Sequence, residues 1–433
     1  MFGIQARHVH VDTTSFSVSG DYTGAKVTGD LDATTIAITY GYSRDHRADL
    51  KQWMLALATT RDGDVPLFLR PLDGNSSDKA SLVAAVEALH KQLSKADEEA
   101  SLYVADSGVY SEANMRRFQA AGIKWVSRVP ETLAEAKAFL EHDVDTRQTS
   151  VDQQIHWISR QITLPQGTER WVLVRTTAGE QRAQETMQRH VKRTQQIWEQ
   201  RLWHLGNQRF ACETDARVAL LREMKTLPTW FELQSSVVSY PRYEKRGRPR
   251  KEAPPVDHEW QIAATPQVNQ ECVAQEVRRR ACFIVATDVL DSAELPDEDL
   301  VTTYKEQGSV ERGFRFLKDP LFLASSIFLK KPERIVALSL IVVLCLLVYR
   351  LAEHRLRTRL AETGQANPNQ TNKPTSTPTM GWIFQCFEGI ELLHVHTVNH
   401  TATIVLRLQP LRMQVLALLG PLYQHIYKNP LSD

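Results

Sequence analysis

The order of strand-like and helix-like segments constrains the fold of this chain more than any other feature of its sequence. Three segments with the alternating apolar pattern of strands come first, over residues 8–14, 35–42 and 65–72. An alternating series of helices and strands follows, over residues 78–93, 102–106, 112–121 and 123–129. Strands followed by such a series indicate an α/β fold, in which helices cover the faces of a sheet. We therefore predict a mixed sheet flanked by helices.

Changes in pattern divide the chain into five predicted segments. The first part of the sheet domain covers residues 1–130, and an inserted lobe with strands and a long polar helix covers 131–280. Residues 281–363 return to the sheet domain with a buried strand at 282–288. A linker rich in Asn, Thr and Pro is predicted over 364–380, and a partly helical C-terminal tail over 381–433.

The composition excludes several kinds of protein. Charged residues make up 24% of the chain and hydrophobic residues 42%, as in soluble globular proteins with two or three lobes. The net charge is only +1, so a nucleic-acid site would depend on local basic clusters. Five scattered cysteines form no CxxC pair, which argues against a zinc site and favours a reducing compartment. We expect a cytoplasmic protein.

One apolar segment, residues 335–349, imitates a membrane span between Arg334 and Arg350. It is shorter than the roughly 18–20 apolar residues that cross a bilayer. It also continues into an amphipathic pattern beyond Arg350. We therefore predict a helix buried in the centre of a large domain, and no membrane partner.

Three carboxylates are the candidate catalytic residues. Asp12 lies on the first predicted strand, Asp106 ends another strand, and Glu311 lies on a later helix. Such a set could bind two Mg²⁺ ions for phosphodiester cleavage, because Mg²⁺ prefers oxygen ligands and two ions can act on the attacking and leaving oxygens. Taken singly, an Asp at a strand end is more often a turn former or a cap. Asp288 is a rival acid at a strand end.

The segment from Tyr304 to Lys318 gives these acids a context. Tyr304, Gln307, Glu311 and Lys318 are spaced so that, in one continuous helix, all four would lie on the same face. A phenol, an amide, a carboxylate and an ammonium group on one face suit a metal ion beside a phosphate. An exposed amphipathic helix with scattered charges is the alternative.

Together these residues resemble the bacterial insertion-sequence transposases of the DDE class. The third acid of one group in that class lies in the pattern Tyr-x2-Arg-x3-Glu-x6-Lys, and Tyr304, Glu311 and Lys318 match its spacing. Gln307 stands where the group usually has Arg. Further matching segments lie at residues 12–16, 42–51, 74–78, 105–108, 310–318 and 332–335.

The resemblance implies a fold, a site and partners. It implies an RNase H-like catalytic core, with a strand-containing insertion between the second Asp and the Glu. It implies that Asp12, Asp106 and Glu311 bind two Mg²⁺ ions, with Mn²⁺ as a substitute, and that Tyr304 and Lys318 contact DNA phosphates. Gln307 and Arg315 are assigned to the same DNA surface. The expected partners are double-stranded DNA and a second copy of the chain.

A basic segment within the inserted lobe is a second candidate for DNA binding. Around residues 236–254 we expect a linker, and it carries the sequence Arg-Gly-Arg-Pro-Arg-Lys with Arg246, Arg248 and Arg250. This sequence resembles the core of an AT-hook, whose arginines lie in a narrow minor groove. General phosphate contacts are the alternative.

The implied function is transposition by cleavage at element ends and strand transfer to target DNA. The first catalytic strand begins within ten residues of Met1, so we expect the chain to lack the N-terminal DNA-binding region of family members. A truncated remnant that binds DNA without completing transposition is therefore the alternative. A nuclease acting on RNA–DNA hybrids explains neither the insertion nor the Tyr304–Lys318 segment. The expected location is the bacterial cytoplasm, at the nucleoid when the protein is bound to DNA.

Overall fold

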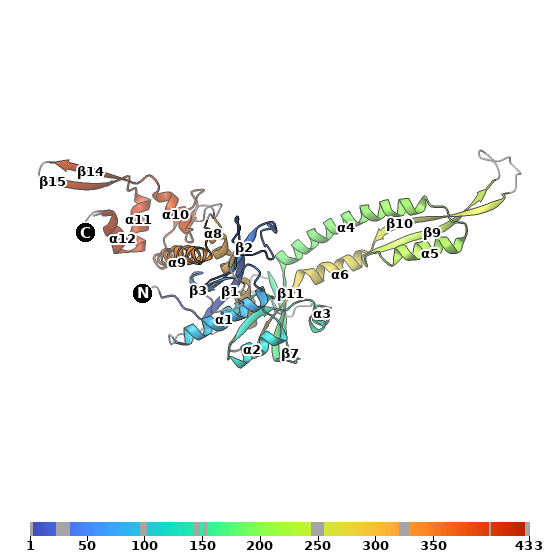
Figure 1. Ribbon diagram of the computed structural model, residues 1–433, viewed down its shortest axis with the longest axis horizontal. Coiled ribbons are helices and arrows are strands. Elements are labelled where there is room, and N and C mark those ends of the chain that lie inside the picture. Colours follow the sequence, from blue (N-terminus) through green and yellow to red (C-terminus); the bar gives the residue numbers. More distant parts are fainter. Residues whose placement is uncertain are drawn as a thin grey trace. The chain divides into compact units, whose positions relative to one another are not determined.

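The computed structural model describes most of the chain, namely residues 3–22, 35–95, 102–141, 148–149, 154–243, 255–319, 329–397 and 400–428. The chain divides into two compact units (Figure 1). Unit 1 comprises Met1–Arg128, Gln161–Arg170 and Val285–Asp433. Unit 2 comprises Val129–Arg160 and Trp171–Ile284. The five segments expected from the sequence stay a prediction.

The sheet of unit 1 is built on five strands in the order β3-β2-β1-β4-β5. These are β1 (His8–Val18), β2 (Lys51–Thr60), β3 (Pro66–Leu72), β4 (Leu102–Ala105) and β5 (Trp125–Arg128). The first three pair antiparallel, whereas β4 and β5 run parallel to β1. This order and these directions are the RNase H-like arrangement, so the predicted fold class is confirmed.

The same sheet continues beyond β5 in the order β11, β8, β7, β6. These strands are β11 (Cys282–Thr287), β8 (Gly167–Thr176), β7 (Ile155–Leu164) and β6 (Gln148–Thr149). One strand prediction was wrong. Residues 35–42 contribute only an isolated bridge between Thr39 and Gln52, and the second strand is β2. Ile36 and Ile38 are nevertheless buried in the core, which explains their strand-like pattern.

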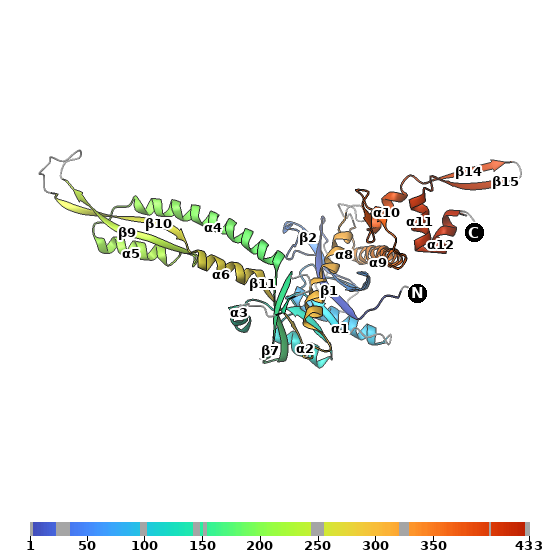
Figure 2. The ribbon, with the colours of Figure 1, turned by 180° about the vertical axis from the view of Figure 1, so that it is seen from behind.

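Helix α8 (Gly308–Leu317) packs against β1 and β2 (Figure 2). Its Val310, Phe314 and Leu317 are buried in one cluster with residues of these strands, including Leu55 and Leu57. Full burial of such a side chain stabilises the fold by roughly 1.5–3 kcal/mol. These three side chains therefore fix the position of α8 on the sheet. The other helices of the sheet domain are α1 (Asp78–Lys95), α2 (Glu112–Ala120) and α7 (Asp297–Lys305).

The long apolar helix is α9 (Pro332–Thr363), and the prediction that it is buried was wrong in part. The helix is long and apolar enough to cross a membrane, and only 28% of its most apolar 18-residue stretch is buried. Ile335, Val343 and Leu346 face the core shared with α8, while Leu344 and Val348 are exposed. The prediction failed in part because residues 335–349 are apolar on every side of the helix. Their pattern therefore does not reveal which side is buried.

The C-terminal part follows α9 in unit 1. The segment predicted as a linker contains a small hairpin of β12 (Asn367–Pro368) and β13 (Pro374–Thr375). Trp382 Nε1 donates to the Pro368 carbonyl at 2.8 Å, which ties this hairpin to α10 (Met380–Phe387). The remaining elements are β14 (Glu391–Thr397), β15 (His400–Leu406), α11 (Pro410–Leu419) and α12 (Pro421–Lys428).

Unit 2 contains a long hairpin with helices along it (Figure 1). The hairpin is β9 (Phe231–Arg242) with β10 (Asp257–Val268), so the linker expected from residue 236 onward is strand as far as Arg242. The strand pattern is faint in the sequence because most residues of β9 are exposed. The helices of this unit are α3 (Ala134–Glu141), α4 (Thr177–Gly206), α5 (Glu213–Met224) and α6 (Gln270–Ala281).

Candidate active site

The parallel pairing of β1 with β4 brings two of the candidate acids together. Val11 lies opposite Ala105 in the register of these strands, and the next residues along the chain are Asp12 and Asp106. Neighbouring strands are about 4.8 Å apart, and residues at the same level point to the same face of a sheet. The sheet therefore places the carboxylates of Asp12 and Asp106 side by side.

Tyr304, at the end of α7, connects Asp106 to the third acid. Its hydroxyl is hydrogen-bonded to the Asp106 side chain, and its pKa is raised above the usual value for tyrosine. Burial is the main cause of this shift, and the negative charges of Asp106 and Glu311 add to it. The Tyr304 hydroxyl is therefore protonated at neutral pH, and it donates a hydrogen bond to a carboxylate oxygen of Asp106. Glu311, on the exposed side of α8, is close enough to act on the same hydroxyl.

Asp12 has a cationic neighbour, Arg44. The Arg44 guanidinium lies 3.7 Å from Asp12 Oδ1 and also donates to the carbonyl oxygen of Thr13. The backbone N–H of Thr13 donates to Asp12 Oδ1 at 2.7 Å. These contacts hold the Asp12 carboxylate beside the strand and offset part of its charge. The sequence analysis did not predict this contact between Arg44 and Asp12.

The prediction of one continuous helix from Tyr304 to Lys318 was wrong. Helix α7 ends at Lys305 and α8 begins at Gly308, with a tight turn at Glu306 and Gln307. At this turn the backbone N–H groups of Gln307, Ser309 and Val310 bond to carbonyls three residues earlier, as from Val310 to Gln307 at 3.1 Å. Gly308 has a low helix propensity, which favours a break here. The four side chains therefore do not share one helical face.

The predicted phosphate contacts at the two ends of α8 have different surroundings. Lys318 Nζ forms an ion pair with Asp45 at 3.1 Å and lies 5.4 Å from the centre of the Phe16 ring. Gln307 is the N-cap residue of α8, but its side chain makes no capping hydrogen bond. Contact of either residue with DNA stays a prediction.

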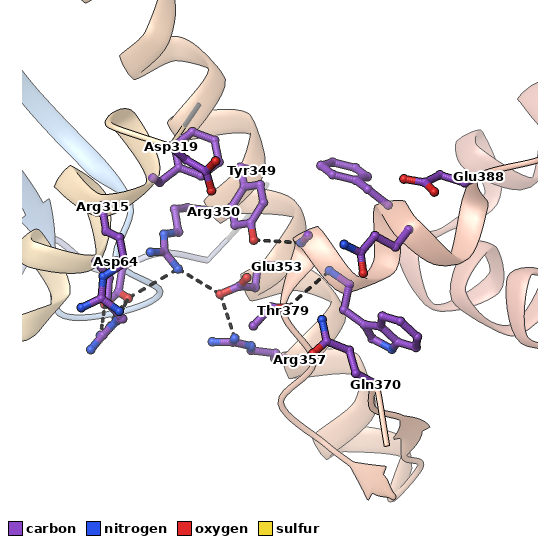
Figure 3. A pocket seen from close by; sticks show the side chains of 16 residues that line it. Asp64, Arg315, Asp319, Tyr349, Arg350, Glu353, Arg357, Gln370, Thr379 and Glu388 are labelled. Atoms are coloured by element: carbon purple, nitrogen blue, oxygen red, sulfur yellow. Dashed lines mark hydrogen bonds and ion pairs between the residues drawn. The ribbon is translucent and has the colours of Figure 1, made fainter. Parts of the chain in front are cut away.

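Arg315 lies at a cavity of about 620 Å³ between α8, α9 and α10 (Figure 3). Within the described residues it has no ion-pair partner. The other three arginines of the cavity are paired: Arg312 lies 2.9 Å from Asp64, Arg350 lies 3.0 Å from Glu353, and Arg357 lies 2.8 Å from Glu353. Arg315 is therefore the arginine of this cavity whose charge is most available to a ligand.

The donor set suits Mg²⁺ in chemistry but is not gathered into a closed site. No three His, Cys, Asp or Glu side chains in the part of the chain that the structure describes lie close enough together to bind one metal ion. Asp12 and Asp106 are nevertheless hard oxygen donors on adjacent strands, and Glu311 acts on the hydroxyl that Asp106 binds. The oxygen donors of these three residues therefore suit Mg²⁺ in kind. Their metal-binding role stays a prediction.

Asp288, the rival acid, lies elsewhere. Its Oδ1 accepts a hydrogen bond from the backbone N–H of Trp125 at 3.0 Å, at the start of β5. Asp106 follows Ala105, which pairs with Ser127 near the opposite end of β5. Asp288 is therefore excluded from the site, and burial raises its pKa to about 6.

Comparison with known proteins identifies the family of the chain. The family described as "Transposase DDE domain" matches residues 23–348, which is most of the chain. The chain belongs to this family. The matched range of this DDE transposase includes Asp106 and Glu311 but begins after Asp12. The role of Asp12 stays a prediction that is based on its position beside Asp106. No curated protein matches the chain.

A solved structure also resembles this DDE transposase. It is the "Cryo-EM structure of piggyBac transposase synaptic complex with hairpin DNA", with a TM-score of 0.38 and 10% sequence identity. The match covers 82% of this chain and 49% of that one, so the present chain spans about half the length of the solved protein.

Some predicted site residues cannot be placed, and one neighbour of the site was missed. Arg246, Arg248 and Arg250 lie outside the described residues. Arg128, at the end of β5, acts electrostatically on Tyr304 and was not singled out. It is level with Asp106 in the parallel pairing of β4 and β5. Strand-end residues of adjacent parallel strands meet at one edge, and this rule could have found Arg128.

Proposed function

We propose that this DDE transposase cuts DNA at the ends of a mobile element and joins the freed 3′ hydroxyl to target DNA. The observation that carries this proposal is the placement of Asp12 beside Asp106 on parallel strands, with Tyr304 hydrogen-bonded to Asp106 and close to Glu311. Membership of the DDE transposase family supports action on DNA. Water is the first nucleophile and the 3′ hydroxyl the second.

Asp12, Asp106 and Glu311 would hold two Mg²⁺ ions, with Mn²⁺ as a substitute. When bound, these ions would activate the attacking oxygen and stabilise the leaving one. The chain's own residues orient this set. Tyr304 would fix the rotamer of Asp106 by donating a hydrogen bond to it. Strands β2 and β4 pair with the two edges of β1, the strand that bears Asp12.

The DNA strand would be held by cations next to Glu311. Arg315 lies one turn after Glu311 on α8 and carries an available charge, and Lys318 lies at the end of the same helix. Lys318 would exchange Asp45 for a phosphate oxygen when DNA binds. Arg246, Arg248 and Arg250 would add contacts that do not depend on base sequence. Two ends must be joined, so we propose that two copies act together, at the nucleoid.

A strand-transfer assay tests the function. The substrate is a duplex oligonucleotide with a pre-cleaved element end taken from the DNA beside the gene, and the reaction is run with Mg²⁺ or Mn²⁺. We expect joined product from the wild type and none from Glu311→Gln, because the amide loses the ligand charge. Glu298→Gln is the control, since Glu298 is an exposed acid on α7.

The outcome also separates the two candidate functions. If wild type and Glu311→Gln bind the duplex equally and neither joins it in either metal, the chain is a DNA-binding remnant. If Glu298→Gln abolishes joining as fully as Glu311→Gln, the assignment of Glu311 is wrong.

A further inference from the structure

The side of α9 that faces away from the core carries a row of exposed apolar side chains. The exposed fractions are 48% for Leu340, 57% for Ile341, 49% for Leu344 and 67% for Val348. Ala337 is exposed in the same row. Contiguous apolar surface of this kind on a soluble domain marks an interaction site.

The spacing of these residues indicates what covers them. Ala337, Ile341, Leu344 and Val348 follow one another at steps of four, three and four, the repeat of a helix that pairs with another helix. The β-branched residues Ile341 and Val348 alternate with Leu344. In a heptad this places them at the a positions and the leucine at a d position, the combination that favours two parallel helices.

The other side of the helix fits the same repeat. Ser339, Val343 and Leu346 are buried against the protein's own core, opposite the exposed row. No charged residue occurs between Arg334 and Arg350, so pairing through this row would bury no unpaired charge. One side of α9 is therefore used by the fold and the other is left for a partner helix.

We propose that α9 is the contact between two copies of this chain, paired in parallel about a two-fold axis along the row. A second copy presents the same residues at the same spacing, so Leu344 meets Leu344 and the contact is self-complementary. The inference rests on the proposed function for the need of two copies, and it names the surface that joins them. Because α8 packs on α9, the pairing links the helices that bear Glu311 in the two copies.

A bilayer is a poorer occupant of this surface. The core side of the same helix segment is buried in one cluster with residues of β1, β2 and α8, so lipid could reach one side only. The ion pair of Arg350 and Glu353 is buried one turn after the row, at 3.0 Å. Both observations favour a protein helix as the partner.

The first experiment measures molar mass by light scattering for the full chain without DNA. We expect a dimer for the wild type and, for Leu344→Glu, a dimer dissociation constant raised at least about tenfold, because two carboxylates would meet in the apolar contact. The matched control is Leu221→Glu, since Leu221 is an exposed leucine on α5 with 57% of its surface accessible. It should remain a dimer.

The second experiment tests the register by crosslinking. Cys345 is exposed on the same helix, so the test is made in a Cys345→Ser background. Under mild oxidation Leu344→Cys in this background should give a disulfide-linked dimer, whereas Leu221→Cys in the same background and the background protein itself should give none. The inference is overturned if the wild type is a monomer or if Leu344→Glu stays a dimer. If the wild type is a monomer, sedimentation with phosphatidylglycerol vesicles would identify a lipid surface as the occupant of the row. The strand-transfer assay is scored separately, so a monomer that joins DNA would refute the α9 contact and leave the proposed function intact.

Discussion

At the scale of single residues, Tyr304 links two of the three acids that the sequence assigned to chemistry. Its hydroxyl donates to Asp106, and the charge of Glu311 helps to raise its pKa. A hydrogen bond to a charged acceptor contributes more than one between neutral groups, about 1.5–3 kcal/mol. We therefore propose that Tyr304 positions Asp106.

Tyr304→Phe tests this role. We expect the rate of strand transfer to fall on the order of 10- to 100-fold, because Asp106 loses the donor that fixes its rotamer. The control is Tyr103→Phe, which removes a hydroxyl that contacts His90 from the same strand that leads to Asp106. An unchanged rate in Tyr304→Phe, with normal folding by circular dichroism, would refute the positioning role.

Asp288 offers a test of burial at one residue. Its pKa is raised to about 6 from an ordinary 3.8, mainly by burial. The folded state therefore binds the proton more tightly than the unfolded state does. The free energy of unfolding should fall as the pH rises from about 4 to about 6 and then level off.

Asp288→Asn should remove this loss while keeping an oxygen for the Trp125 N–H. We expect the variant to be more stable than the wild type by about 1–3 kcal/mol at pH 7 and equal to it below pH 4. Urea unfolding at several pH values measures the difference. Asp291→Asn, at an exposed acid that accepts the Ala293 N–H, should show no such gain.

At the scale of elements, local patterns predicted the strands that lead to Asp12 and Asp106 and the helices α1 and α2, but not the break before the helix that carries Glu311. β1 was found because Val9 and Val11 alternate with polar residues, whereas β4 and β5 were found as short, mostly apolar runs ended by polar residues. The break between α7 and α8 was missed because the spacing of Tyr304, Glu311 and Lys318 fits one helix and only Gly308 signals an interruption. The contact of Arg44 with Asp12 was not predicted because it joins two segments that are distant in sequence.

The close approach of α8 to the sheet gives a prediction at this scale. A Cβ atom at Gly313 would lie 3.2 Å from Leu57 Cδ2 and 3.5 Å from Leu346 Cδ2. Gly313→Val should therefore destabilise the protein by about 1–3 kcal/mol and reduce strand transfer, since it pushes α8 and Glu311 off β2. Thermal unfolding and the joining assay measure both effects. Gly308→Ala has room for its methyl group and should be close to neutral.

At the scale of the whole molecule, a net charge of +1 means that DNA affinity depends on local clusters. Replacing Arg246, Arg248 and Arg250 with Ala should weaken binding to any duplex. The slope of the logarithm of the binding constant against the logarithm of the salt concentration should become less steep by about 3. Fluorescence anisotropy over a range of KCl concentrations measures this slope. Arg116 and Arg117 are already paired with Glu112 and Glu87, so replacing both with Ala should change it much less.

The three acids differ in how firmly the backbone holds them. Asp12 lies within β1, where pairing with β2 continues as far as Val18. Asp106 comes just after the last residue of β4, and Glu311 follows the turn between α7 and α8. Amide hydrogen exchange should accordingly be slow around Asp12 and faster from Lys305 to Gly308. Closure of the site around a substrate would then be a hinge motion at Glu306 and Gln307, with the sheet as its fixed arm.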